Sequence, residues 1–167
     1  VQAVHTARMP EGNLIGMRIE SAKDYEVFVD ILEQLAHIHA AEIIHRDIKP
    51  ENILRRTDET GNRQVRIIDF DIARVTPEAP EYLIAEQLFR QEDSFVGTVP
   101  YSGPERMAPG GINIDDPRLD IYSVGAMLYE AVTGEFPCET CCATPTKPHD
   151  HIPPDPEKLT TAGVPPA

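Results

Sequence analysis

The sequence predicts a mainly α-helical fold with one short β-hairpin, and three patterns support this prediction. Apolar residues recur at intervals of three and four across residues 27–38, as expected for one face of an amphipathic helix. A second apolar stretch covers residues 119–133, and two β-prone segments flank the turn-like sequence TDETGN at residues 57–62. With 167 residues and a hydrophobic content of 41%, the chain is large enough for one domain, or part of one, with a real core.

The N-terminal part is expected to hold a strand, a turn and a helix. Residues 1–7 read as a short strand, and the sequence PEGN at residues 10–13 is typical of the turn that ends it. Ser21 can cap the following helix, and Asp24 lies in its first turn, where a carboxylate is favourable. The predicted buried face of this helix consists of Val27, Phe28, Ile31, Leu32, Leu35 and Ile38.

The predicted hairpin pairs residues 53–55 with residues 65–68 through a Gly-Asn turn. This pairing would bring Asn52 and Asp69, which flank the two strands, close together. Residues 75–96 are polar and acidic, with two prolines and then a weakly helical stretch, and we interpret them as a long mobile segment.

A second helix is expected to lie inside the domain. Asp116 and Pro117 favour a helix start, apolar residues from 119 to 133 fall on all sides of the helix, and Gly134 favours a stop. The Pro-rich residues beyond 137 have no periodicity and predict a loop or connector. A zinc site is the alternative there, but it is disfavoured because such sites usually sit on preformed turns; its ligands would be drawn from Cys138, Cys141, Cys142, His149 and His151.

Composition restricts the possible partners and location. The net charge is −13, which would repel nucleic acid and an anionic membrane surface, so a phosphate-bearing ligand must be held by local donors or metal ions. The sequence contains no run of eighteen apolar residues and no segment with the pattern of a signal peptide. The three cysteines lie within five residues, unlike a disulfide framework. We therefore expect a soluble, cytoplasmic protein in a reducing compartment.

The sequence HRDIKPEN at residues 45–52 has residue types and spacings that suit phosphoryl transfer. This chemistry needs an acceptor hydroxyl in line, positive charge near the transferring oxygens and metal ions on the phosphates. Asp47, Lys49 and Asn52 can supply these functions from one loop, and Asp69 offers a second oxygen ligand for magnesium. A chance set of surface polar residues is the alternative, which the order and spacing disfavour.

Four ordered segments resemble motifs of the eukaryotic-type (Hanks-type) serine/threonine protein kinases. Residues 45–52 resemble the HRDxKxxN catalytic loop, and Asp69-Phe70-Asp71 stands at the position of the DFG motif. The sequence GTVPYSGPE at residues 97–105 resembles the GTxxYxAPE segment, and residues 120–137 are similar to the central buried helix of the family. The resemblance covers nearly the whole chain and implies a protein kinase-like fold.

The resemblance also implies that the chain contains only the C-terminal lobe of a kinase domain. Residues 1–14 would be the last strand of the N-terminal lobe and the hinge, residues 15–137 the core of the C-terminal lobe, and residues 138–167 a connector toward the next helix. The glycine-rich loop, the strand lysine and the last helices would then be missing. Glu105 would lack its usual arginine partner, and such a buried unpaired charge costs about 3 to 5 kcal/mol.

The resemblance assigns roles to individual residues. Asp47 would orient the substrate hydroxyl, Lys49 would contact the γ-phosphate, Asn52 and Asp69 would ligate Mg²⁺, and Thr98 would form part of the peptide-binding floor. His45 and Phe70 would stack in the core, and Thr6 would be the gatekeeper. The residues that would bind ATP are Ala7, Met9, Lys49, Glu51, Asn52, Leu54 and Asp69.

One departure from the family pattern and two hydroxyl groups bear on activity and regulation. Asp71 replaces the glycine of the DFG motif, which adds a carboxylate near the metal site and predicts weakened or altered metal use. Ser94 is a possible phosphorylation site for which Arg46 could be the partner, and Thr76 is a weaker candidate.

The predicted function is that of a protein serine/threonine kinase, which transfers the γ-phosphoryl group of ATP to serine or threonine of protein substrates. Lys49 favours serine or threonine as the acceptor. The first alternative is an inactive kinase-like scaffold, for which Asp71 is the main argument. A small-molecule phosphotransferase is disfavoured by Lys49 and by residues 97–105. We expect the 167 residues by themselves to be inactive.

Overall fold

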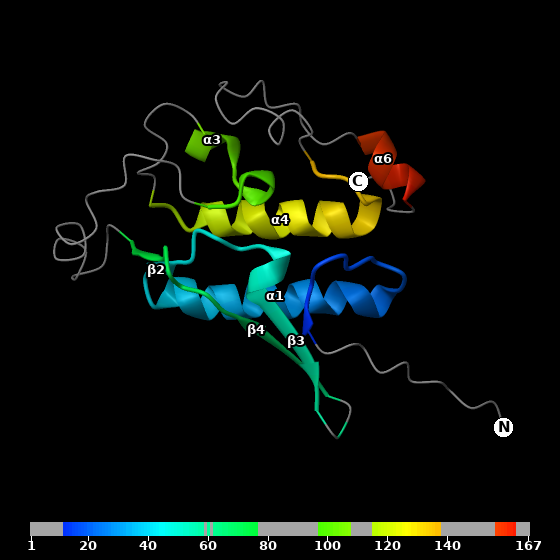
Figure 1. Cartoon of the computed structure of the whole chain (residues 1–167), viewed down its shortest axis with the longest axis horizontal. Coiled ribbons are helices and arrows are strands. Elements are labelled where there is room, and N and C mark those ends of the chain that lie inside the picture. The colour runs from blue at the N-terminus through cyan, green and yellow to red at the C-terminus, as the bar shows by residue number, and fades with distance from the viewer. Residues whose placement is uncertain are drawn as a thin grey trace.

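The computed structural model describes residues 12–58, 60, 62–76, 97–107, 115–137 and 156–162. Within these ranges two long helices, α1 (Ala22–Ala40) and α4 (Arg118–Thr133), pack against each other in antiparallel orientation (Figure 1). A β-hairpin of β3 (Ile53–Thr57) and β4 (Arg63–Ile67) packs against α1. The prediction of a mainly helical fold with one short hairpin is therefore confirmed. The strand predicted at residues 1–7, residues 77–96 of the predicted mobile segment and residues 138–155 of the predicted connector lie outside the described residues. The prediction of a connector over 138–167 is wrong for residues 156–161, which form a short helix.

Helix α1 begins where the sequence predicts. The Asp24 carboxylate accepts hydrogen bonds from the backbone N–H groups of Ser21 (2.7 Å) and Glu20 (3.0 Å), which satisfies donors that a helix start leaves open. Four of the six residues of the predicted buried face are buried and Ile38 is partly buried. The prediction is wrong for Leu32, which is 42% exposed, because it follows Ile31 by one residue and so lies about 100° further round the helix.

A short strand, β1 (Gly12–Asn13), pairs antiparallel with β3 and gives the sheet order β1-β3-β4. The predicted turn at residues 10–13 is therefore wrong for its last two residues, whose backbone groups pair with the outer edge of β3. The hairpin strands extend closer to the turn than predicted. Asp58 closes this turn by accepting hydrogen bonds from the N–H groups of Thr60 and Asn62, both at 2.9 Å.

Short elements position the segment that precedes β3. Strands β2 (Ile43–Ile44) and β5 (Arg74–Val75) pair antiparallel and form a second small sheet. The 3-10 helix η1 (Pro50–Asn52) leads directly into β3. Helix α4 is contacted by a second 3-10 helix, η2 (Val99–Tyr101), and by the short helix α6 (Pro156–Thr161). The short helix α3 (Pro104–Met107) follows η2 in the chain (Figure 1). Residues 45–49 thus connect β2 to η1.

Helix α4 has the predicted limits, and Arg18 completes its C-terminal end. The helix follows Pro117 and ends at Gly134, which adopts a left-handed conformation with φ of +82°. The Arg18 guanidinium donates to the carbonyl oxygens of Glu130 (3.2 Å) and Val132 (3.4 Å). The prediction that α4 is buried on all sides is wrong, since Ile121 is 46% exposed; α1 and η2 cover only part of its circumference.

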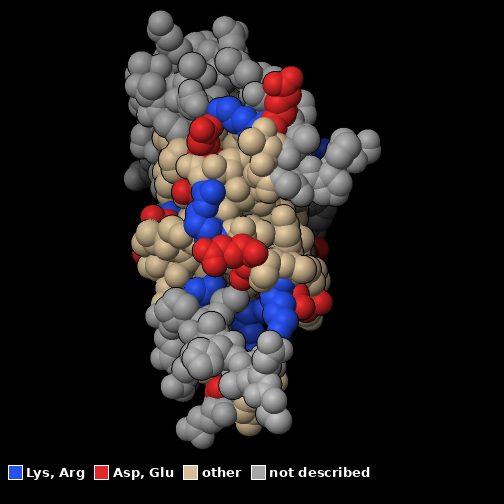
Figure 2. All heavy atoms as spheres, turned by 90° about the vertical axis from the view of Figure 1, so that its right-hand side faces the viewer, with Lys and Arg blue, Asp and Glu red and all other residues tan. Residues whose placement is uncertain are grey.

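The described surface is mixed in charge. Figure 2 shows lysine and arginine side chains interspersed with aspartate and glutamate side chains on one face of the molecule. The negative net charge therefore does not appear on this face as one acidic patch. Among the described helices, none is both long enough and apolar enough to cross a lipid bilayer.

We expect the substitution Asp24→Asn to lower the free energy of unfolding by about 1 kcal/mol at pH 7. Burial opposes ionisation of Asp24, but hydrogen bonds from Glu20 and Ser21 outweigh it and hold the pKa of the carboxyl below its ordinary value of 3.8. The carboxylate therefore stabilises the fold above about pH 4, and this contribution is lost as the pH falls through the lowered pKa. Urea unfolding at pH 7 and pH 3 measures both effects, with Glu33→Gln on the same helix as the control. An equal loss at both pH values would contradict this account.

Gly134→Ala should destabilise the chain by about 2 kcal/mol, because alanine is strained at positive φ. Its methyl group would also collide with the Arg18 guanidinium. The matched control is Gly125→Ala, at an exposed position inside α4 with no atom close enough to clash. That control should stabilise the helix by up to about 1 kcal/mol. Thermal unfolding that moves in the same direction for both variants would be inconsistent with the left-handed end of α4.

Candidate active site

One buried carboxylate, that of Asp120 on α4, fixes the loop at residues 45–47. Its Oδ2 accepts a hydrogen bond from the backbone N–H of His45 (2.9 Å), and its Oδ1 accepts one from the N–H of Arg46 (2.8 Å). The Nε2 atom of His39, near the end of α1, lies 2.8 Å from Oδ2. Asp120 is fully buried, so these donors replace the water that the carboxylate has lost. The loop is thereby tied to both long helices.

Arg46 bends the chain immediately before Asp47. Its φ angle of +68° lies in the left-handed region, which a residue other than glycine adopts only at a cost in energy. The hydrogen bond from its N–H group to Asp120 stabilises this conformation. The strained turn directs the Asp47 side chain toward the residues that were predicted to act with it.

The Asp47 carboxylate is the centre of a hydrogen-bonded cluster. Its Oδ2 accepts from Lys49 Nζ at 2.6 Å and from Asn52 Nδ2 at 3.2 Å, and its Oδ1 accepts from Thr98 Oγ1 at 2.9 Å. Asn52 Nδ2 also lies 2.9 Å from the Asp47 carbonyl oxygen. The side chains of Asp47 and Lys49 keep 12% and 21% of their surface exposed. Four residues predicted to share a site thus contact one another through a single carboxylate that a substrate can still reach.

Asn52 and Asp69 offer oxygen atoms that fit a magnesium ion. The N–H of Ile68 donates to the Asn52 carbonyl oxygen at 2.9 Å, which brings the residue before Asp69 against the loop, as the hairpin predicts. Within the described residues, the Asn52 Oδ1 atom and the Asp69 carboxylate accept no hydrogen bond. Amide and carboxylate oxygens are ligands that Mg²⁺ prefers. Asp69 is exposed, with φ of +67°, a region that aspartate enters more readily than most residues.

His45 and Phe70 contact each other, but only His45 lies in the core. Their ring centroids are 4.6 Å apart at an angle of 59°, and His45 Nε2 lies 2.9 Å from the carbonyl oxygen of Ile68. Phe70 is 44% exposed, so its predicted place in the core is wrong; it lies in the connection after β4, where solvent reaches much of its side chain. Leu54 on the hairpin and Glu51 in η1 are also exposed. Their predicted contacts with ATP stay predictions.

Other predicted residues lie elsewhere. The Thr76 side chain is buried and its N–H donates to the Glu42 carbonyl oxygen at 2.7 Å, which argues against phosphorylation there. Glu105 is exposed, and its carboxylate folds over Gly103, so the expected cost of a buried unpaired charge does not arise. Several residues of interest lie outside the described ranges: Thr6, Ala7, Met9, Ser94, Cys138, Cys141, Cys142, His149 and His151.

Sequence reasoning missed three residues whose hydrogen bonds lead to the loop: Asp120, His39 and Arg106. Asp120 was noticed only as part of an apolar helix, although a carboxylate among apolar helix positions must find several donors if it is buried. His39 lies near the end of α1, and a histidine there has no local pattern that reveals a buried carboxylate partner. Arg106, which follows GTVPYSGPE, carried no signal of its own, yet it is one of the largest fully buried side chains.

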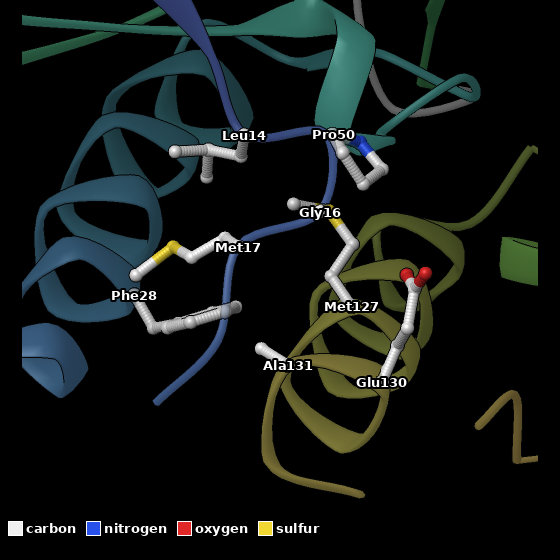
Figure 3. Close-up of a pocket in the computed structure, with 8 residues that line it drawn as sticks. All are labelled: Leu14, Gly16, Met17, Phe28, Pro50, Met127, Glu130 and Ala131. Carbon is white, nitrogen blue, oxygen red and sulfur yellow. The ribbon is translucent and has the colours of Figure 1, made fainter. Parts of the chain in front are cut away.

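A small hollow beside the loop is too small to be a nucleotide site. It lies between α1, α4 and Pro50, and Figure 3 shows apolar side chains around it with Glu130 at one edge. The space inside is about 10 Å³, enough for roughly one water molecule. Glu130 Oε2 accepts a hydrogen bond from the Tyr101 hydroxyl at 2.7 Å, which links α4 to η2.

Comparison with known proteins identifies the family. Residues 12–151 match the protein kinase domain family. The chain is 41% identical over 98 residues to "Serine/threonine-protein kinase A" of Synechocystis, which is 59% of this chain and 17% of that protein. It is 34% identical over 137 residues to a probable serine/threonine-protein kinase of Dictyostelium discoideum, which is 82% of this chain and 8% of that protein.

A third relative, mitogen-activated protein kinase kinase 7 of Arabidopsis thaliana, is 35% identical over 108 residues, which is 64% of this chain and 31% of that protein. The chain belongs to the protein kinase family, in its serine/threonine (Hanks-type) class. It spans less than a third of the length of these curated relatives.

Thr98→Val is expected to lower the free energy of unfolding by about 2 kcal/mol, because it removes a hydroxyl donor from a partly buried charged carboxylate. Thr60→Val is the matched control, since it removes a hydroxyl bond to Asp58 in an exposed turn, and it should cost well under about 1 kcal/mol. Chemical denaturation of the two variants measures the difference. Equal losses would mean that Thr98 does not hold Asp47.

Proposed function

We propose that the protein carrying this chain is a serine/threonine protein kinase that transfers the γ-phosphoryl group of ATP to protein substrates with the help of Mg²⁺. The observation that carries the proposal is the cluster in which Lys49, Asn52 and Thr98 all contact the Asp47 carboxylate. Membership of the protein kinase family and the names of the relatives support it. The relatives are much longer than this chain, so the activity of the whole protein is part of the proposal.

Asp47 would accept the proton of the substrate hydroxyl. A carboxylate has about four lone-pair sites, and three described donors contact Asp47, so acceptor capacity is left for a substrate. Thr98 and Asn52 would hold the two oxygen atoms in a fixed orientation while the hydroxyl approaches. Such orientation is the main contribution that a protein makes to phosphoryl transfer.

Lys49 and the two oxygen ligands would manage the charge of the phosphates. The Lys49 ammonium lies beside Asp47 and would contact the γ-phosphate. Bound Mg²⁺ would neutralise the phosphate oxygens, with Asn52 and Asp69 as its protein ligands. Glu51, Leu54, Ala7 and Met9 would complete the ATP site, as the family resemblance implies.

We further propose that residues 1–14 are the last strand of the N-terminal lobe and the hinge, and that residues 15–137 are the core of the C-terminal lobe. The 167 residues contain no glycine-rich phosphate loop and no strand lysine of the family type. They should therefore not phosphorylate a peptide by themselves, and measurable transfer by the purified chain would contradict this.

A catalytically impaired scaffold is the second candidate, and Asp71 is the observation that favours it. Asp71 is exposed and lies in a tight turn closed by the hydrogen bond from Ala73 N–H to the Phe70 carbonyl oxygen at 3.0 Å. A carboxylate there would add charge beside the Asp69 ligand. In the full-length protein, Asp71→Gly should change the Mg²⁺ concentration needed for transfer; an unchanged requirement would count against a role for Asp71.

The kinase proposal is tested by Asp47→Asn in the full-length protein. We expect kcat for transfer from γ-labelled ATP to fall by at least about 100-fold, because the proton acceptor is lost. Asp58→Asn, in the exposed hairpin turn, is the control and should leave kcat unchanged. Phosphoamino-acid analysis should find phosphoserine or phosphothreonine. Full activity in the Asp47 variant, or phosphotyrosine as the product, would refute the proposal.

Metal binding is tested on the 167-residue chain with Mn²⁺ as a paramagnetic probe. Small amounts of Mn²⁺ should broaden the NMR signals of the Asn52 side-chain amide and the Asp69 backbone amide, because a bound ion would lie beside both. Asp69→Asn should abolish this broadening, whereas Asp116→Asn, at the start of α4, should not. Broadening that survives in the Asp69 variant would place the ion elsewhere.

A further inference from the structure

Arg106 is a charged side chain in an interior position that the proposed chemistry does not use. It lies in α3, directly after Pro104 and Glu105, and only 2% of its surface is exposed. Arginine is almost never buried to this degree unless strong acceptors meet its donors. The acceptors of Arg106 therefore indicate what this residue does in the fold.

One acceptor is the backbone of the catalytic loop. Arg106 Nη1 donates to the carbonyl oxygen of Arg46 at 3.1 Å, and this hydrogen bond is buried. Arg46 is the strained residue that precedes Asp47, and its N–H group is held by Asp120. Its backbone is thus bonded on both sides, by α4 at the N–H group and by α3 at the carbonyl group.

The carbonyl bond controls the position of Asp47. The Arg46 carbonyl group belongs to the same rigid peptide plane as the Asp47 nitrogen. The N–H group of Arg46 is fixed by Asp120. The Asp47 N–H in this plane donates to His45 Nδ1 only at 3.3 Å, so the bond to the carbonyl oxygen is the shorter of the two that oppose a turn of the plane. Rotation would move the Asp47 Cα atom and with it the carboxylate. A donor on the Arg46 carbonyl oxygen stops this movement.

We propose that Arg106 is a positioning residue that holds the peptide plane before Asp47 and thereby sets the place of its carboxylate. This inference rests on the proposed kinase function. Thr98, eight residues earlier in the same segment, donates to Asp47 Oδ1 at 2.9 Å. The segment from Thr98 to Arg106 therefore holds Asp47 twice, by its side chain and by its backbone. A displacement of this segment would release both contacts together.

Three variants test the proposal in the full-length protein. Arg106→Met removes the donor, Arg106→Lys keeps a positive donor, and Arg118→Met, at the exposed start of α4, is the control. We expect Arg106→Met to lower kcat by at least about tenfold with little change in the KM for ATP, because misplaced reacting groups slow the chemical step. Arg106→Lys should keep most of the wild-type kcat. A loss of kcat no larger than in the Arg118 variant would overturn the proposal.

A second readout does not depend on catalysis. In the 167-residue chain, Arg106→Met should shift the carbonyl ¹³C signal of Arg46 and the amide signal of Asp47 while the amide signals of α1 stay in place. Unchanged signals at these two residues, or equal changes throughout α1, would overturn the positioning role. If Arg106→Met does not fold, the same two NMR signals are measured in Arg106→Lys. The shorter donor should still shift the Arg46 carbonyl signal, and an unchanged signal would overturn the positioning role. If the wild-type protein transfers no phosphate, the kinase proposal fails. The NMR signals of Arg46 and Asp47 still test whether Arg106 holds the loop.

Discussion

The hydrogen bonds to the Asp120 carboxylate are the interaction on which the rest of the site depends. A fully buried carboxylate is costly unless donors surround it, and here donors come from α1 and from two successive residues of the loop. If the carboxylate were lost, those donors would be left buried without an acceptor, at a cost of about 1 to 3 kcal/mol each. The same bonds that make the charge tolerable therefore determine the loop conformation.

The residues of the apolar core and the residues of the proposed site lie on different parts of the fold. The two long helices and the hairpin contain most of the buried apolar residues, whereas Asp47, Lys49 and Asp69 lie on the connections between elements. Such connections can position groups accurately only when they are tied to rigid elements. Asp120 provides this tie from α4, Thr98 and Arg106 provide it from residues 98–106, and the Ile68 to Asn52 hydrogen bond provides it from the hairpin.

Features that depend on neighbouring residues were predictable from the sequence. The start of α1 at Ser21, the end of α4 at Gly134 and the hairpin each follow from a cap, a stop or a turn within a few residues. The cluster around Asp47 was predictable from the order of the motifs. Phe70 was misplaced because its burial depends on which distant elements cover it, whereas Leu32 was misplaced because the predicted face was drawn too wide around the helix.

The roles of Asp120 and Arg106 were not predictable from local pattern. Each acts through a hydrogen bond to a backbone atom more than fifty residues away, at Arg46, and a backbone atom has no sequence signature. The left-handed conformation of Arg46 is equally hidden, since arginine has no preference for it. The sequence can show that a charged residue inside an apolar segment requires hydrogen-bond partners if it is buried. The structure identifies those partners.

The central claim, that Asp120 holds the loop beside α4, is tested most directly by amide hydrogen exchange of the unmodified chain. If the account is correct, the amides of His45 and Arg46 exchange as slowly as those in the middle of α4, because they open only when the helix packing opens. Exchange of these two amides at the rate of the exposed hairpin turn at Thr60 and Asn62 would contradict it.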